Sequence, residues 1–402
     1  MTITMDRRRF LLQSAGGSLA GGLAAARGAP ATAPLPADGA AGPIVQSPPV
    51  VMAPRADGAE IVWAVARLAR GRVEVDAGGK TRVFAGTPDG FAPQGDRVLR
   101  VRLDGLKPGT VCRYRTITEA GAPPAAREES PWRTFRTLDP AASATHFAVW
   151  NDTHNQAPVL GKLDDLTPEV DVLFWNGDTC NNWDEENWIA PTLLHPGGRD
   201  LTARRPLCFV WGNHDVRGRW AFRASAYVAM PQGRPFHAFR SGPVAFVCLH
   251  TGEDKPDDHP SFEGRAAFEP LRREQAAWLR DHVLATPGLC DAPFRVVVCH
   301  MPMRMADETG KADYDLFGKR SRDLWHDPLV AWKAQVVVSG HAHQPAWVPA
   351  SDAFPYAQLI GGGPKPENAT WIDGQAGPGG LRLVMRKLDG SVVADQTLQP
   401  VR

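Results

Sequence analysis

Beyond residue 139, short apolar runs alternate with segments of helical character, and this alternation restricts the fold more than any other feature of the chain. Short apolar strands separated by helices are typical of a sheet that is covered on both faces. The clearest helical segment is 271–284, which places Leu271, Gln275, Trp278 with Leu279, and His282 with Val283 on one helical face. We therefore expect a layered α/β core built on strands at 146–150, 172–176, 207–211, 244–249, 295–299 and 336–339.

Two other regions show strand-like runs without helices between them. The later runs at 356–360, 381–387 and 391–398 are expected to close the core as an antiparallel portion. Between 47 and 138, Gly, Pro and Asp clusters separate short β-type runs, which is typical of a small all-β sandwich. The runs in this N-terminal region are 60–65, 72–76, 97–103, 110–118 and 132–137.

The first 31 residues have the composition of an export signal. Arg7, Arg8 and Arg9 precede a weakly apolar stretch that extends to Ala26, and small residues follow. The pattern resembles a twin-arginine signal, with an ordinary secretory signal or a weak membrane anchor as the alternative. Residues 32–46, rich in Pro, Ala and Gly, are expected to be a linker. We expect a periplasmic or secreted protein whose mature chain has no transmembrane helix, because no later run reaches about 18 apolar residues.

Charge and cysteine content limit the classes of partner. The 45 Lys+Arg and 44 Asp+Glu give a net charge of +1, which argues against a nucleic-acid-wrapping or polybasic membrane-surface protein.

The six cysteines include no CxxC pair and no zinc-ribbon spacing. Cys208, Cys248 and Cys299 lie inside apolar runs, where a thiol behaves as a small hydrophobe. We expect a mostly reduced, structural set of cysteines, and the oligomeric state stays open.

Five of the expected core strands end in residue types that bind metal ions. The side chains are carboxylates, imidazoles and amides, without thiolates, a set that suits Fe, Mn, Co or Zn. Because ligands bind beyond the carboxyl ends of the strands in open α/β sheets, the five clusters are expected to converge at one edge. They are Asn151-Asp152-Thr153-His154, Asn176-Gly177-Asp178-Thr179, Trp211-Gly212-Asn213-His214-Asp215, Cys299-His300-Met301-Pro302 and Ser339-Gly340-His341-Ala342-His343.

In this order, DxH, GD, GNHD, a strand-final His and GHxH resemble the signature of calcineurin-like metallophosphoesterases, over residues 145 to about 345. The resemblance implies a layered αββα sandwich, placed at 139–402, and hydrolysis of phosphoric esters by a hydroxide that bridges two metal ions. Two cations held close together need a shared carboxylate to offset their repulsion. The implied ligands are Asp152, His154 and His343 for the first metal, Asn213, His300 and His341 for the second, and Asp178 for both.

Two neighbours of the ligand Asn213 are expected to take part in catalysis. His214 resembles the family's histidine that is not a ligand and that protonates the leaving alkoxide or stabilises the transition state. A further metal ligand or a turn residue is the alternative for His214. Asp215 is expected to orient His214 or a neighbouring ligand.

The all-β region followed by this domain resembles the arrangement in purple acid phosphatases. Residues 103–114 resemble the corner before a late strand of fibronectin type III-like domains, with Cys112 in place of the usual first aromatic and Tyr114 two residues later. Residues 47–138 are therefore expected to be a fibronectin type III-like sandwich. The motifs depart from that subgroup, which lacks a histidine at the position of His154 and has a tyrosine ligand at the position of Asn181. We expect an imidazole in place of the phenolate.

Residues around the motifs leave substrate recognition open. Arg304 is either a phosphate contact or a surface residue, and His250 either lines the pocket or packs in the core. Trp183 and Trp188 suit either stacking on a base or sugar, or core packing. The polar segments 251–264 and 301–320 are placed as lids.

The hypothesis drawn from these features is an exported hydrolase of small-molecule phosphate mono- or diesters, with two divalent or trivalent metal ions (Fe, Mn, Zn or Co) as cofactors. The alternative is a metal-stabilised surface binding or adhesion protein without turnover. The histidine at 214 argues against the alternative, because a purely structural metal site needs no additional imidazole beside its ligands.

Overall fold

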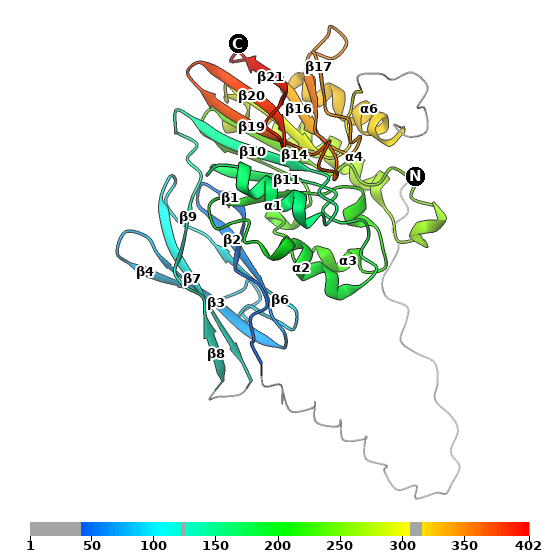
Figure 1. The fold of residues 1–402 in the computed structure, drawn as a ribbon. Helices are drawn as coiled ribbons and strands as arrows, with labels where there is room; N and C mark the ends of the chain where they lie inside the picture. The colour runs from blue at the N-terminus through cyan, green and yellow to red at the C-terminus, as the bar shows by residue number, and fades with distance from the viewer. Residues whose placement is uncertain (1–41, 122–124, 306–315, 402) are drawn as a thin grey trace, which may run out of the picture. The chain divides into compact units, whose positions relative to one another are not determined.

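The computed structural model describes residues 42–121, 125–305 and 316–401 (Figure 1). The export signal expected at 1–31, residues 32–41 of the expected linker and part of the expected 301–320 lid lie outside these residues. Residues 42–402 group as one unit. Within the described residues, no helix is both long enough and apolar enough to cross a membrane.

The larger central sheet has nine strands in the order β21-β20-β19-β10-β11-β12-β1-β2-β6. Its middle is a parallel set, β10 (Thr145–Asn151), β11 (Val172–Asn176) and β12 (Leu207–Val210), whose residues are almost all buried. The strands β19 (Thr370–Gly377), β20 (Gly380–Lys387) and β21 (Val392–Leu398) continue the sheet in antiparallel register. The antiparallel portion expected at 381–387 and 391–398 is therefore confirmed.

The second central sheet has six strands in the order β13-β14-β15-β16-β18-β17. Four of them run parallel: β14 (Val244–Leu249), β15 (Phe294–Cys299), β16 (Val336–Ser339) and β18 (Ala357–Ile360). The edge strands β13 (His237–Ser241) and β17 (Ala346–Val348) pair antiparallel with their neighbours. The run at 356–360 was thus wrongly expected in the antiparallel portion, because the loop after β16 returns the chain to pair β18 parallel with β16.

The two sheets pack face to face, and helices cover both outer faces (Figure 1). Between the sheets lies an apolar cluster that includes Phe147, Phe174 and Phe246. α1 (Ala157–Leu166) and α2 (Ile189–Leu193) pack on the nine-stranded sheet. α4 (Phe268–Trp278), the π-helical η6 (Leu279–Val283) and α6 (Leu316–Ala331) pack on the six-stranded sheet. These four layers are the expected αββα sandwich.

The helix expected at 271–284 starts earlier and changes its winding. It begins at Phe268, and its last turn is π-helical. On the expected face, Trp278, Leu279 and Val283 are buried, whereas His282 is exposed. Arg272 is fully buried, because its guanidinium donates to the backbone oxygens of residues 251 and 253.

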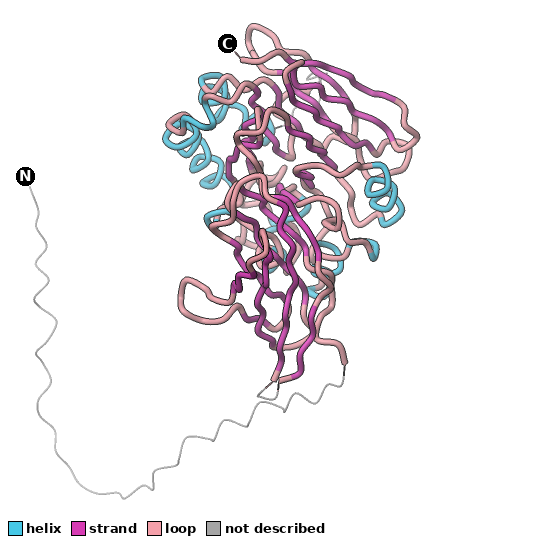
Figure 2. The backbone as a smooth tube through the Cα atoms, turned by 90° about the vertical axis from the view of Figure 1, so that its left-hand side faces the viewer, coloured by secondary structure: helices cyan, strands magenta, loops and turns pink. Residues whose placement is uncertain are grey.

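A third sheet comes from the N-terminal region and has β4 (Thr81–Phe84), β3 (Ala69–Asp76), β7 (Val111–Ala120) and β8 (Ala126–Glu129), with β5 (Gln94–Gly95) and β9 (Arg133–Arg136) at its sides. It packs against β1 (Val50–Arg55), β2 (Gly58–Ala64) and β6 (Val98–Leu103) through a separate apolar cluster. None of the described residues between 42 and 138 is helical, and Figure 2 shows this region as strands and loops.

The N-terminal strands β1, β2 and β6 also extend the nine-stranded sheet, because β1 pairs parallel with β12 through Met52 and Leu207. The all-β region thus shares a layer with the α/β core, while the boundary at 138 and 139 stays a prediction. The Tyr114 hydroxyl donates to the backbone oxygen of Pro49, 3.4 Å away, across this β arrangement.

The remaining short helices are η1 (Glu186–Trp188), η2 (Pro196–Gly198), η3 (His214–Val216), α3 (Ala221–Ala224), η4 (Pro231–Gly233), η5 (Pro260–Phe262) and α5 (Pro287–Cys290).

Candidate metal centre

The five strand-end clusters converge, but at the carboxyl edges of two sheets and not at one edge of a single sheet. The loops after β10 and β11 are joined by backbone bonds from Asp152 and His154 to residues 177 and 178. The loop after β16 joins them because the His341 amide donates to both carboxylate oxygens of Asp152, at 3.0 and 2.9 Å. The amide of Gly340 donates to the backbone oxygen of His300 after β15. The site therefore spans both sheets.

The backbone at this edge is strained where side chains must turn inward. Five of the expected ligands have φ angles between 43° and 67°, a region that costs free energy for residues with a Cβ atom. Strain of this kind clusters at functional sites, where the surrounding structure holds it in place. The five residues are Asp152, His154, Asp178, His341 and His343.

Two motif glycines are required by the close approach of the carboxylates. A Cβ atom on Gly212 would lie 2.4 Å from Oδ1 of Asp178, and one on Gly340 would lie 2.2 Å from Oδ2 of Asp152. No side chain fits at these distances. The glycines of GNHD and GHxH therefore let neighbouring strand ends approach the two carboxylates.

The first ligand group is formed by Asp152, His154 and His343, whose ligand atoms lie within 4.8 Å of one another. Nε2 of His343 is 3.2 Å from Oδ1 of Asp152. Nδ1 of His154 is 2.8 Å from Oδ1 of Asn181. Because this amide oxygen can only accept a hydrogen bond, Nδ1 carries the proton, and Nε2 is the unprotonated nitrogen. Nε2 of His154 lies 3.5 Å from Oδ2 of Asp178. The structure therefore brings together the expected first-metal ligands, and Asn181 orients one of them.

The second ligand group is formed by Asp178, His300 and His341, again within 4.8 Å, with Asn213 beside it. Nδ1 of His300 donates to the backbone oxygen of Asn176 at 2.9 Å, so that Nε2 faces Oδ1 of Asp178 at 3.1 Å. Oδ1 of Asn213 is 2.9 Å from Nδ1 of His341. The expected second-metal ligands thus lie together.

Asp178 lies between the two groups, with one oxygen turned to each. Its Oδ1 faces His300, and its Oδ2 faces His154. The Asp178 side chain is fully buried, and the backbone amide of His214 donates to its Oδ1 at 2.8 Å. This is the position that a bridging carboxylate must take.

The donor set fits bound cations. Nε2 of His154 and Nε2 of His300 are buried and make no hydrogen bond, although each faces a carboxylate. Burial lowers the pKa of His300, but the charges of Asp178 and Asp152 outweigh burial and raise it to about 10. A buried group of carboxylates that holds a proton on a neighbouring imidazole this strongly calls for positive charge, which metal ions would supply. The lone pairs and the charge balance both suit metal binding.

His214 lies beside His154 of the first group, with ring centroids 4.8 Å apart, and is partly exposed. Its Nδ1 is 2.7 Å from the backbone oxygen of Asn181, and Nη1 of Arg217 is 2.8 Å from its Nε2. Nε2 of His214 also lies 4.0 Å from Oδ2 of Asp178, and the ligand atoms of His154, Asp178 and His214 all lie within 4.8 Å of one another. Burial and the charge of Arg217 lower the pKa of His214, whereas the charge of Asp178 raises it, and the net shift is downward.

Asp215 is buried between the loops after β11 and β12. Its carboxylate accepts from the amides of Gly212, Asp178 and Thr179 at 2.8 to 3.0 Å, and from the Thr179 hydroxyl at 2.5 Å. These bonds fix the backbone of Asp178. Of the two roles considered for Asp215, the contacts support the orientation of a ligand.

Sequence reasoning missed two charged residues at the site. Glu253 is fully buried and accepts from Nδ2 of Asn213 at 3.3 Å, which turns the amide oxygen toward His341. Arg217 binds Glu253 through Nε and Nη2 at 2.8 and 2.6 Å and also contacts His214. Arg217 could have been found from the sequence, because it follows the GNHD motif by two residues. Glu253 lies in an irregular loop after β14, and no motif in the sequence marks it.

Four substrate candidates are placed by the structure. Trp183 and His250 are buried, and His250 stacks on Trp211 with ring centroids 5.9 Å apart, so both pack in the core. Arg304 donates to the backbone oxygens of residues 349 and 356 at 3.0 Å. Trp188 is 47% exposed and remains accessible to a ligand.

A cleft of about 440 Å³, lined mostly by polar residues, includes Arg217, the partner of His214, in its wall. Its walls come from the loops around 182–184, 217–219 and 253–265, and they include Arg219, Lys255 and Arg265. The loop expected at 251–264 as a lid thus lines the cleft. This volume suits a small organic molecule.

The family of the chain follows from a match over the residues that carry the site. Residues 145–345 match the calcineurin-like phosphoesterase family, and the chain belongs to that family. It is therefore a metal-binding hydrolase of phosphoric ester bonds. No curated protein sequence matches the chain.

Two solved structures share the fold. Purple acid phosphatase PPD1 from yellow lupin (Lupinus luteus) seeds superposes with a TM-score of 0.64 at 14% identity, covering 87% of this chain and 74% of that chain. PhoD superposes with a TM-score of 0.57 at 13% identity, covering 87% of this chain and 92% of that chain. At these identities the likeness shows the fold alone.

Proposed function

We propose that the protein is an exported phosphoesterase that hydrolyses phosphate mono- or diesters at a dinuclear metal site. The observation that carries the proposal is the position of Asp178, whose two carboxylate oxygens face the two ligand groups. A carboxylate shared in this way is what two adjacent cations need. The family membership supports the reaction class.

The two ions would be held by Asp152, His154 and His343 on one side, by Asn213, His300 and His341 on the other, and by Asp178 between them. When bound, they would supply Lewis acidity to the phosphoryl oxygens and an activated water nucleophile. Each metal-facing nitrogen of His154 and His300 is directed by a hydrogen bond at the opposite ring nitrogen.

The chain's own residues supply the remaining steps. Nε2 of His214 lies beside Asp178 and accepts from Arg217, so His214 would protonate the leaving alkoxide after taking up a proton at Nε2 in place of this contact. Arg217 contacts the same nitrogen and is anchored by Glu253, which fixes it against the site. The cleft next to Arg217 receives the alcohol part of the ester. A phosphoryl group at the site and an organic group in the cleft describe a small-molecule phosphate ester.

The competing idea of a binding protein without turnover is less well supported. A structural metal site needs ligands and packing, but it needs no partly exposed histidine with an arginine at its Nε2 and a polar cleft beside it. Export by a twin-arginine signal stays part of the proposal and rests on Arg7, Arg8 and Arg9.

The test compares the full chain with its Asp178→Asn variant after loading with metal. 4-Nitrophenyl phosphate and bis(4-nitrophenyl) phosphate report monoester and diester hydrolysis separately. The variant should lose at least about 10³-fold of kcat on the substrate that the wild type prefers, because it removes a charge shared by both ions. Asp165→Asn, at an exposed carboxylate, should retain full turnover. Undiminished turnover by Asp178→Asn, or none on either ester by the loaded wild type, would contradict the proposal.

A further inference from the structure

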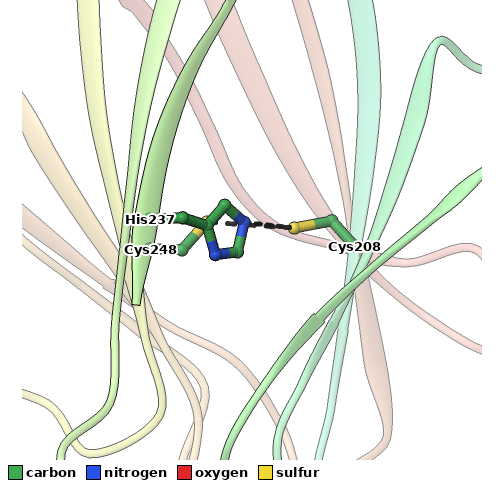
Figure 3. A group of neighbouring side chains, drawn as sticks. All are labelled: Cys208, His237 and Cys248. Atoms are coloured by element: carbon green, nitrogen blue, oxygen red, sulfur yellow. Dashed lines mark hydrogen bonds between the residues drawn. The ribbon is translucent and has the colours of Figure 1, made fainter. Parts of the chain in front are cut away.

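A second cluster of ligand-type side chains lies away from the phosphoesterase site, between the two central sheets. Cys208, on β12 of the nine-stranded sheet, faces Cys248 and His237 on the adjacent strands β14 and β13 of the other sheet (Figure 3). Figure 3 shows the imidazole directed from one side toward the thiol on the other. The ligand atoms of the three residues all lie within 4.8 Å of one another.

Packing alone does not account for this arrangement. Cys208 and Cys248 are each 1% exposed, within an apolar cluster. Two buried thiols in such a core behave as small hydrophobes and need no imidazole. Here Nε2 of His237 approaches Sγ of Cys208 to 3.4 Å, and the His237 ring is stacked on Phe239 at a centroid distance of 6.0 Å. The polar nitrogen is thus held against the two sulfur atoms.

The separations match those around a tetrahedral ion. Sγ of Cys208 lies 3.9 Å from Sγ of Cys248 and 3.4 Å from Nε2 of His237. With Zn–S bonds of about 2.3 Å and Zn–N bonds of about 2.0–2.1 Å at tetrahedral angles, ligand atoms lie about 3.8 Å (S to S) and about 3.6 Å (S to N) apart. A disulfide would require the two sulfur atoms to close to about 2.05 Å. The cluster therefore has the spacing of a cation site.

The surroundings offer a fourth ligand. Cys208 and His237 line a pocket of about 230 Å³, large enough to admit a water molecule.

We propose that Cys208, Cys248 and His237 form a third metal site, which binds a zinc-type divalent cation with water from the adjacent pocket as fourth ligand. Two thiolates and one imidazole select a soft or borderline ion, whereas the phosphoesterase site has no thiolate. The bound ion cross-links β12 to β13 and β14, and so ties together the two sheets whose ends carry the catalytic loops. The proposal does not depend on the reaction performed at the other site.

Cobalt provides a readout that only a thiolate site can give. The full chain, freed of metal with chelator and kept reduced under nitrogen, is titrated with Co²⁺ and followed by absorption. A thiolate-to-cobalt charge-transfer band in the near ultraviolet reports this site alone, because the phosphoesterase ligands are carboxylate, imidazole and amide. The wild type should develop the band and bind one more Co²⁺ per chain than the Cys208→Ser variant, which should lack it.

Two further variants keep the test decisive. His237→Ala changes a half-buried residue on an edge strand, so this variant should fold even if Cys208→Ser does not. It should weaken Co²⁺ binding by more than about tenfold, because removal of a ligand should lower the affinity more than removal of a residue that hydrogen-bonds to a ligand. Cys112→Ser changes a buried thiol in the N-terminal region and should leave the band intact. His282→Ala, in the same pocket but outside the cluster, should also leave it intact.

Three results would overturn the third metal site. The first is the absence of a charge-transfer band in fully reduced, Co²⁺-loaded wild type. The second is a band that persists in Cys208→Ser with unchanged intensity. The third is a Cys208–Cys248 disulfide in the protein as isolated, detected as a linked peptide and a mass lower by two hydrogen atoms, since oxidised sulfur cannot supply the two thiolates.

Discussion

The ligand histidines are oriented by the partners of their other ring nitrogens. Nδ1 of His300 donates to a backbone oxygen, and Nδ1 of His154 donates to the side chain of Asn181. The first partner cannot be removed by substitution, but the second can. Asn181 thus offers a direct test of how far ligand orientation matters at this site.

Asn181→Ala should weaken metal binding at the first ligand group by about 10- to 100-fold, because His154 loses the acceptor that fixes its tautomer. Asn181→Asp keeps an acceptor oxygen and should retain most of the affinity. Calorimetric titration of the metal-free protein measures both. Asn182→Ala, at the next position along the chain, is the matched control, and equal losses in Asn181→Ala and Asn182→Ala would refute the role of Asn181.

His214→Ala should lower kcat by about 10²- to 10⁴-fold while the metal content stays near that of the wild type. The reason is that its imidazole serves the leaving group rather than the metal ions. An ester with a nitrophenolate leaving group, which needs no proton, should recover part of the loss. His195→Ala provides the control. If metal content falls together with turnover, His214 is a ligand, in agreement with its distance of 4.0 Å from Asp178.

For single residues, the sequence predicts the metal ligands better than it predicts the residues that hold the ligands and their loops in place. Each expected ligand belongs to a short motif at a strand end, and the structure brings all seven together. Glu253 and Arg272 belong to no such motif. Glu253 is placed by a loop, and the buried Arg272 donates to the backbone oxygens of that loop from α4, the helix that covers the same sheet. Contacts of this kind depend on tertiary packing, which residue spacing does not encode.

Secondary-structure elements bring these residues together through the close approach of strand ends. Gly212 shows how little room is left, since an added Cβ would lie 2.3 Å from the amide nitrogen of Asp178. Any side chain here must push apart the loops after β11 and β12. The glycine of GNHD is thus part of the site's geometry.

Gly212→Ala should therefore reduce turnover by at least about 10²-fold, because a shift of about 1 Å in a reacting group has an effect of that size. Metal content should fall as well, since Asp178 moves. Gly86→Ala is the control: its added Cβ would meet no atom within 4 Å, and it should behave as the wild type. A wild-type kcat in Gly212→Ala would contradict this prediction, because it would show that the loops after β11 and β12 can move apart without loss of turnover.

In the α/β core, strands with continuous apolar runs were predicted close to their bounds, whereas β19, with a mixed sequence, was not predicted. β11, β14 and β16 have the expected bounds because every residue in them is buried. β19 was missed, since its sequence TWIDGQAG interrupts the apolar run with Asp373 and Gly374. Gly374 is needed there because the ring of Phe147 packs against it, 2.2 Å from where a Cβ would lie. That requirement arises from the neighbouring strand.

On the scale of the whole molecule, the N-terminal β region and the catalytic core share a sheet. β1 pairs parallel with β12, although the paired residues are more than 150 positions apart in the sequence. No local sequence pattern predicts this pairing. The sequence missed strands such as β1 and β19, but it predicted the classes of the two regions. Their joining through β1 depends on which edge strand of the core is left open, and only the assembled sheet determines this.

The proposed export signal at residues 1–31 gives a prediction about the transport of the protein. Changing Arg7 and Arg8 together to Lys should block export, with precursor accumulating in the cytoplasm, because the twin-arginine route requires the guanidinium pair. Arg9→Lys alone should have a much smaller effect. Fractionation with antibody detection measures both. Unimpaired export of the double variant would assign the protein to the general secretory route, and its hydrolase activity would be unaffected.

The central claim is that two ions act together on the two sides of Asp178, and counting the ions required for turnover tests it most directly. Metal-free protein is titrated with Mn²⁺, which thiolates disfavour, so that the cysteine cluster does not contribute. Bound Mn²⁺ and ester hydrolysis are measured at each step. The account predicts that turnover rises to its plateau only as the second Mn²⁺ per chain binds, and that Asp178→Asn reaches no such plateau. Full turnover without metal, or a plateau at one Mn²⁺ per chain, would contradict it.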